Sequence, residues 1–555
     1  MNIFSSISSL FFNLIVFSLS FFLTNCVSQK SDTKDQNQAT NNLQDSLRIS
    51  IVQESTQKYY AKNIQAINLK NHIELLASES FEGRKVGERG QKMAGSYIQD
   101  FFIKNHLEPS VPKEGSKRYL QEFQVEKSEI KEVTITSRDD GEKYYHKTDF
   151  LANPYTYLHN ENELNVVLTG YSILLNEQIS GRGVALFLDT DNREEIFYSN
   201  QDWNEKTELQ ILLAQKMGAK SIFFILTNSD NFKYNAKRLK KSKYLNQEIY
   251  TLKTEKSIDV HFLSMQTAAS LFDYTETELE KMAKQFKEKE IPSNLPYVSI
   301  SIKVEKENVV SFTTENIIGF IEGSDKKEEV IIISAHYDHL GVINKDGKKT
   351  IFMGADDNAS GVSSLLELAK TFALAKKDGV VPKRSILFLA TTAEEMGMLG
   401  SSYYADISPV FPISNVVANL NIDMIGREYL PKTKYPNNDY ISIVGSDWNS
   451  PVLHQTNELA NQTFTQLNLD YRYNSKSDPE EFFYRSDQYS FAKYNVPVIF
   501  YTSPDHKDYH KASDIPEKID FKRVEKVTKL IFHTVWQLAS QEKTTRTIKK
   551  DIFQE

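Results

Sequence analysis

The sequence predicts an α/β protein with an open, mainly parallel (mixed) sheet and helices on both faces. After residue 310, short apolar runs alternate with amphipathic stretches, which is typical of strands and helices in such sheets. The composition, 40% hydrophobic and 25% charged residues, is that of a soluble globular protein. Polar residues follow several of the apolar runs, as expected at the carboxyl ends of strands, where sites form.

The first residues contain the one membrane-like segment. Residues 10–23, LFFNLIVFSLSFFL, are short and interrupted for a membrane span and resemble the apolar core of a secretory signal. Cys26 follows after Thr24 and Asn25 and is the only cysteine, so a disulfide within the chain is impossible. We therefore expect a signal peptide of lipoprotein type over residues 1–25, acylation of Cys26, and a membrane-anchored protein in the periplasm or on the cell surface.

Residues 27–50 are polar and contain no aromatic residue, so they cannot bury enough surface to become ordered. We expect a flexible polar tether over residues 26–60 that holds the folded part away from the membrane. The formal net charge of -8 argues against nucleic acid as a partner.

The N-terminal part of the body, residues 61–150, begins with apolar residues at spacings of three and four, interrupted by the Gly-containing FEGRKVGERG. This pattern predicts two helices around a loop. Residues 151–305 change to short β-rich runs, NVVLTG, GVALFLD and SIFFIL, with the amphipathic ELQILLAQKMGA before the last. We expect a separate small α/β unit inserted there.

The strands expected after residue 310 are EVIIISA, SILFLATT, NVVANLNID, YISIVG and VPVIFYTS, and the helices include GVSSLLELAKTFALAKK and RVEKVTKLIFHTVWQLAS. Imidazole and carboxylate groups come at or near the ends of these strands. They are His336, Asp338, His339, Asp356, Asp357, Glu394, Glu395, Asp423, His506, His510 and Asp514, with Tyr509 beside His510.

Each of these residues alone has an ordinary structural explanation, such as a helix cap for an aspartate. If these groups were buried together as unpaired charges, their burial would cost several kcal/mol of free energy. A divalent cation bound among them would offset this cost. Imidazole with carboxylate suits Zn²⁺, with Mn²⁺ or Co²⁺ as possible substitutes. Three carboxylates and two imidazoles are too many for one catalytic zinc, and they fit two metals that share a bridging carboxylate.

At these residues the sequence resembles the dinuclear, co-catalytic zinc aminopeptidase family of peptidase clan MH, of the aminopeptidase Y type. The resemblance runs from HIELLASESFEGRKVGERG to YHKASDIPEKID, roughly residues 65 to 540, and includes SAHYDH, GADDNASG and NIDMIG in the family's order. It implies a zinc-exopeptidase-like fold over residues 306–545 as the main peptidase domain. It also implies that the insert at 151–305 is similar to a protease-associated domain.

The resemblance also implies the role of each site residue. The metal ligands would be His336, Asp357, Glu395, Asp423 and His510, with Asp357 as the bridge and followed by a cis peptide bond. Glu394 would be the general base and Tyr509 the donor to the oxyanion. Asp338 and Asp514 would support the ligands from behind. Gln488, where relatives often have histidine, leaves the role of that position open.

The function this implies is hydrolysis of the N-terminal bond of peptides by a water that bridges two zinc ions. A carboxypeptidase of the glutamate carboxypeptidase II type is the alternative, and Arg427 or Arg485 would then hold a terminal carboxylate. A glutaminyl-cyclase-like enzyme with one zinc, or a receptor-like relative without metal, agrees less well with a complete set of ligands.

Glu394 and Glu395 are adjacent, and neighbouring side chains of an extended strand point to opposite faces. Both can serve one site only if the strand has ended and the backbone turns there. The MGMLGS that follows permits such a turn. We therefore expect Glu395 to bind a metal and Glu394 to remain unligated beside it.

Overall fold

The computed structural model describes residues 51–546 except 154–158, 160, 174–178, 193–195, 197–204, 242–247, 255–257, 291–292 and 429–438. The chain divides into two units, Met1–Val52 and Gln53–Glu555. The predicted signal peptide, Cys26 and most of the predicted tether lie outside the described residues and stay predictions. Among the helices that are described, none has the length and apolar character needed to cross a membrane.

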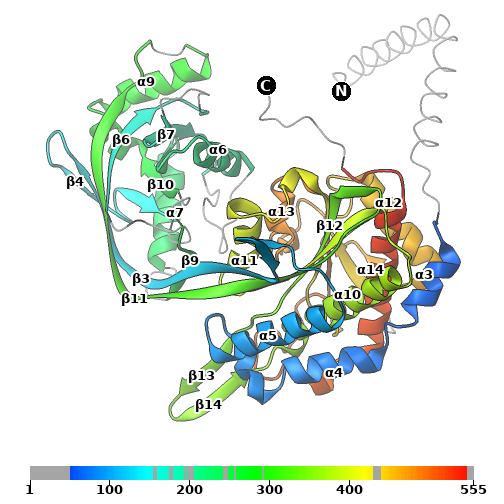
Figure 1. The fold of residues 1–555 in the computed structure, drawn as a ribbon. Coiled ribbons are helices and arrows are strands. Elements are labelled where there is room, and N and C mark those ends of the chain that lie inside the picture. Colours follow the sequence, from blue (N-terminus) through cyan, green and yellow to red (C-terminus); the bar gives the residue numbers. More distant parts are fainter. Residues whose placement is uncertain are drawn as a thin grey trace, which may run out of the picture. The chain divides into compact units, whose positions relative to one another are not determined.

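The predicted sheet is present, and all five expected strands lie in it; β12, one of its inner strands, is labelled in Figure 1. Four are parallel neighbours in the order β19, β16, β12, β15. Antiparallel strands lie on both sides of this group, with β11 beside β15 and β17 beside β19, and β18 next to β17. The bounds are β11 Tyr297–Ile321, β12 Lys326–His336, β15 Arg384–Thr391, β16 Val416–Ile422, β17 Tyr440–Val444, β18 Asn468–Asp470 and β19 Val498–Thr502. The prediction of a mainly parallel, mixed sheet is confirmed.

Helices α10 (Gly361–Lys377) and α14 (Phe521–Ser540) pack against β12 and β15 on one face of the sheet. Their aromatic side chains meet, since the ring centroids of Phe372 and Phe532 are 5.0 Å apart. On the other face, an apolar cluster joins Ile332 and Leu389 to residues around α13. Smaller elements complete this region: α11 Leu399–Ser402, α12 Pro451–Ala460, α13 Tyr489–Ala492 and the 3₁₀ helix η8 Phe482–Tyr484.

The two helices predicted around FEGRKVGERG are α4 (Ala66–Leu76) and α5 (Arg89–Lys104), with the 3₁₀ turn η1 (Glu79–Arg84) between them. A further helix, α3 (Glu54–Ala61), begins inside the segment predicted to be a tether. Its Tyr60 ring stacks on Trp536 of α14 with centroids 5.7 Å apart. The residues from Glu54 onward therefore belong to the folded part.

The β-rich region contains a parallel group in the order β6, β7, β8, β10, with β5 antiparallel at its edge. Its elements are β3 Leu120–Ser137, β4 Lys143–Tyr145, β5 Phe150–Ala152, β6 Glu161–Leu168, β7 Gly183–Leu188, α6 Glu205–Lys216, β8 Ser221–Leu226, α7 Ser229–Lys241, β9 Ile249–Leu252, β10 Asp259–Ser264, α8 Met265–Leu271 and α9 Glu276–Lys287. The first half of β11 pairs with β6 and its last residues pair with β15. β3, which precedes residue 151, pairs with β11 as well. The predicted boundaries and the likeness to a protease-associated domain stay predictions.

Two short hairpins lie outside this sheet, β1 (Val111–Lys113) with β2 (Ser116–Arg118) and β13 (Gly341–Lys345) with β14 (Lys348–Phe352). In the sheet itself, parallel pairing brings the carboxyl ends of four strands to one edge. His336 is level with Thr391 at the ends of β12 and β15, and Ile422 is level with Tyr501 near the ends of β16 and β19. The loops after these strands therefore meet.

Candidate metal centre

The structure brings together the five residues predicted as metal ligands. His336 ends β12, and Asp357 lies in the turn Ala355–Ser360 that leads into α10. Glu395 follows β15, Asp423 follows β16, and His510 lies in the turns after β19. Each ligand thus comes from the carboxyl end of a strand or from the start of a helix beside it.

The first cluster consists of His336, Asp357 and Asp423. Nε2 of His336 is 3.4 Å from Oδ1 of Asp357 and 3.3 Å from Oδ1 of Asp423. Nδ1 of the same ring is 3.2 Å from the backbone carbonyl of Asp338, which can only accept, so Nδ1 carries a proton and Nε2 is the nitrogen that can bind a metal. Both Nε2 and Oδ1 of Asp423 are buried without a hydrogen-bond partner. A cation would satisfy these atoms.

The second cluster shares Asp357. Nε2 of His510 is 3.2 Å from Oδ2 of Asp357 and 3.1 Å from Oε2 of Glu395. His339, which the sequence placed near the site without a role, has Nδ1 2.6 Å from Oε1 of Glu395. A carboxylate accepts, so His339 donates this hydrogen bond and fixes the Glu395 side chain.

The two clusters fit a pair of divalent cations. In His336, Asp357 and Asp423, and again in His339, Asp357 and Glu395, the candidate ligand atoms all lie within 4.8 Å of one another. Asp357 directs one oxygen to each cluster. The nitrogen and oxygen donors suit zinc better than a hard cation such as Mg²⁺. The arrangement therefore has the features expected of a bridging carboxylate.

Glu394 lies beside the first cluster, with Oε2 4.0 Å from Nε2 of His336. Burial raises its pKa well above the ordinary value, and the neighbouring carboxylates of Asp423 and Glu395 add to this, whereas His336 opposes it. The backbone leaves the extended conformation at Ala393, whose φ is 58°. This turn allows Glu394 and Glu395 to reach the same site, as the sequence required.

The two supporting aspartates hold backbone as well as side chains. The carboxylate of Asp338 is 3.8 Å from Nδ1 of His336 and accepts the backbone N–H of Glu394 at 3.2 Å. Burial raises the pKa of Asp338 to about 7. The carboxylate of Asp514 accepts the backbone N–H groups of Asp356 and Asp357. Both residues thus fix the segments that carry site residues. The Asp357–Asn358 peptide bond is cis, as expected.

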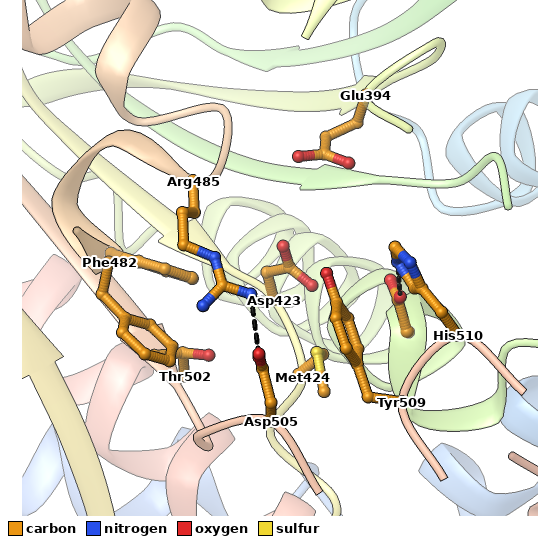
Figure 2. Close-up of a pocket in the computed structure, with 11 residues that line it drawn as sticks. Glu394, Asp423, Met424, Phe482, Arg485, Thr502, Asp505, Tyr509 and His510 are labelled. Carbon is orange, nitrogen blue, oxygen red and sulfur yellow. Dashed lines mark hydrogen bonds and ion pairs between the residues drawn. The ribbon is translucent and has the colours of Figure 1, made fainter. Parts of the chain in front are cut away.

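Tyr509 lines a pocket that reaches both clusters (Figure 2). Its ring stacks on that of His510, with centroids 3.9 Å apart. Burial raises the pKa of its hydroxyl, and the carboxylates of Asp357 and Glu395 add to this. The hydroxyl therefore keeps its proton and can donate a hydrogen bond.

Gln488 lies behind Asp423 in a buried polar network. Its side chain accepts a hydrogen bond from Asn421 at 2.9 Å and donates one to the carbonyl of Phe483 at 2.9 Å. Asn421 also donates to Ser486, which in turn donates to Oδ2 of Asp423 at 2.8 Å. Gln488 thus contributes to the position of this carboxylate.

Arg84 is a residue that the sequence did not single out, although it lies in FEGRKVGERG. It is fully buried, and its guanidinium donates to the carbonyls of Tyr337, Met353 and Gly354, at 2.9, 2.7 and 2.9 Å, and to that of Leu76 at 2.6 Å. These carbonyls precede the segments that carry Asp338 and Asp357. An arginine directly after a glycine, in a loop between two helices, was the available signal.

Replacing Arg84 by methionine is expected to leave several buried carbonyls without a donor and so lower the free energy of unfolding by about 2–4 kcal/mol. We also expect weaker metal binding, because the segments before Asp338 and Asp357 lose a common anchor. Chemical denaturation and zinc titration measure the two effects. Arg138→Met is the control, since Arg138 makes an exposed ion pair with Glu163. Unchanged zinc affinity in Arg84→Met would contradict the role in positioning.

Residues 316–535 match the model of Peptidase family M28. The chain contains an M28 domain. Aminopeptidase YwaD of Bacillus subtilis is 26% identical over 245 residues, which cover 43% of this chain and 48% of YwaD. A probable zinc metalloprotease of Pyrenophora teres f. teres is 26% identical over 278 residues, covering 43% of this chain and 54% of that protein. The chain thus spans about half the length of these relatives.

A shorter match has a higher sequence identity. A probable glutamate carboxypeptidase of Arthroderma benhamiae is 38% identical over 109 residues, which cover 20% of this chain and 14% of that protein. Among solved structures, an aminopeptidase from Aneurinibacillus sp. strain AM-1 is 19% identical, with a TM-score of 0.44, and the match covers 88% of this chain and 97% of that one.

Proposed function

We propose that the M28 domain is a metal-dependent exopeptidase, and specifically an aminopeptidase that uses two zinc ions. The observation that carries this proposal is the position of Asp357, which directs one oxygen to each of two clusters. Glu394 lies beside the clusters as a carboxylate with a raised pKa. The names of YwaD and of the zinc metalloprotease relative support the reaction and the metal.

One ion would be held by His336, Asp357 and Asp423, and the other by Asp357, Glu395 and His510. His339 already donates to Glu395 through Nδ1, so it is assigned to holding that ligand. Zinc bound at such a site polarises a substrate carbonyl and makes water a nucleophile at neutral pH. Mn²⁺ or Co²⁺ with the same donors would supply similar chemistry.

Proton transfer and stabilisation of the oxyanion are assigned to two residues of the chain. Glu394 takes a proton from the attacking water and passes it to the leaving amine. A raised pKa favours the first of these steps, because the carboxylate then takes up a proton from the water more readily. The hydroxyl of Tyr509 donates a hydrogen bond to the oxyanion that forms at the carbonyl carbon.

A panel of matched peptides with free and acetylated N-termini tests the proposal. The zinc-reconstituted protein is expected to cleave only the free peptides, to release the first residue, and to lose activity when zinc is chelated. Cleavage of acetylated peptides from the C-terminal end would instead support the carboxypeptidase alternative. Failure to retain zinc after reconstitution, together with no cleavage, would support the receptor-like alternative.

A further inference from the structure

The pocket beside the metal clusters has a second side, away from the metal ligands. Figure 2 shows Arg485 and His510 on opposite sides of this pocket, with Tyr509 between them. In Figure 2, Phe482, Thr502 and Asp505 lie on the same side as Arg485, and Met424 and Phe500 also line the pocket. A charged guanidinium therefore lines the same pocket as Asp357, Asp423 and His510 of the two clusters.

Arg485 is held in place from two directions. Its Nη2 donates to both carboxylate oxygens of Asp505, at 3.0 and 2.9 Å. Its guanidinium carbon is 4.5 Å from the ring centroid of Phe482, a distance at which a cation is attracted to an aromatic face. Burial lowers the pKa of Arg485, but Asp505 and Tyr509 raise it more, so the net shift is upward. The side chain is thus a fixed positive group.

The guanidinium has donors left for a further acceptor. An arginine carries five N–H donors, and in the described part of the chain its hydrogen bonds to carboxylate all come from Nη2. Asp505 already faces Arg485 with both oxygens. A basic group entering the pocket would meet the guanidinium, whereas a carboxylate would find donors in a planar arrangement that matches its own.

We propose that Arg485 is a specificity-determining residue that binds a carboxylate of the substrate, and that this carboxylate is the side chain of an N-terminal Asp or Glu. This inference rests on the proposed aminopeptidase function. In that reaction the first residue lies next to the carbonyl that is attacked, and so its side chain enters the adjoining pocket. Met424, Phe482 and Phe500 line the pocket and would provide apolar contact for the methylene groups of the side chain.

The test compares kcat/KM for three tripeptide amides that begin with Glu, Gln or Lys, using the zinc-reconstituted full chain. We expect the protein to prefer Glu over Gln by about 10- to 100-fold, because a buried hydrogen-bonding group discriminates strongly against a substrate that lacks its partner. In Arg485→Met this ratio should fall to about 1, mainly through a higher KM for the Glu peptide. Arg485→Lys keeps the positive charge but lacks the planar set of N–H donors of the guanidinium, so it should give an intermediate Glu to Gln ratio.

The matched control is Arg472→Met. Arg472 also donates to an aspartate, Asp470, and lies over an aromatic ring, that of Tyr473, but it does not line this pocket. Its substitution should leave the Glu to Gln ratio unchanged. Zinc content and thermal melting of each variant establish that it is folded, and a ratio of two rates on one preparation is insensitive to the fraction that is active.

Three results separate the inference from the function on which it rests. No release of an N-terminal residue from any peptide would overturn the proposed function itself. Release from all three peptides at similar rates, with the same ratio in Arg485→Met, would overturn the role of Arg485 alone. A preference for peptides with a free C-terminal carboxylate over their amides, lost in Arg485→Met, would overturn the assignment to the N-terminal side chain.

Discussion

Glu394→Gln is expected to retain two zinc ions and lose turnover by about 10²–10⁴-fold, the range for removal of a general base. Oε2 of Glu394 lies 4.0 Å from Nε2 of His336, while Glu395 lies within 3.1 Å of His510 and 2.6 Å of His339. The amide of glutamine keeps the shape of Glu394 but cannot take up the proton. Metal analysis and kcat measured on the same preparation check both statements.

Glu395→Gln is the partner experiment, because the two residues are adjacent and chemically identical. It should lose about one of two zinc ions, since an amide is a weak ligand for zinc and the hydrogen bond from His339 is weakened. If Glu394→Gln and Glu395→Gln lose zinc equally, the division of roles between the two glutamates is wrong.

Asp357→Asn is expected to have the broadest effect, loss of most bound zinc and of turnover on the order of 10³-fold or more. Oδ1 of Asp357 lies 3.4 Å from His336 and Oδ2 lies 3.2 Å from His510, so one substitution changes both clusters. An asparagine offers a single oxygen and no charge. Zinc stoichiometry after dialysis, followed by the rate on an unblocked peptide, measures the effect.

The neighbouring aspartate provides the control. Asp356 lies in the same turn and is equally buried, but its Oδ1 accepts the backbone N–H of Gly426 at 2.6 Å and its Oδ2 lies 3.2 Å from His506. Asp356→Asn can keep the acceptor for Gly426 and should retain zinc. A variant that loses zinc as readily as Asp357→Asn would show that charge in the turn, rather than bridging, holds the metals.

The strands and main helices could be predicted because their signals are local. GVSSLLELAKTFALAKK is an amphipathic run, and it forms α10 over the same residues. The site could be approached because the ends of parallel strands share one edge, so residues as distant as His336 and His510 had to be near each other. Their individual roles came from the resemblance to a known family.

Other features depended on contacts that no local pattern reports. The start of α3 at Glu54 depends on Trp536, far along the chain, against which Tyr60 stacks. The bond from His339 to Glu395 depends on side-chain directions in two loops. Arg84 acts through the backbone carbonyls of distant segments. Every residue has such a carbonyl, so the sequence does not indicate which of them accepts a hydrogen bond from a given side chain.

The order of strands in the sheet affects when the site can form during synthesis. β19 lies between β16 and β17 although it follows both in the chain. Until β19 leaves the ribosome, β17 and β18 can pair with each other, but not through β19 to β16. The same late strand leads directly into Tyr509 and His510. Because domains generally fold as units during synthesis, we expect the sheet to close and the last proposed zinc ligand to be added only after β19 has been made. A partly synthesised chain therefore lacks the complete centre.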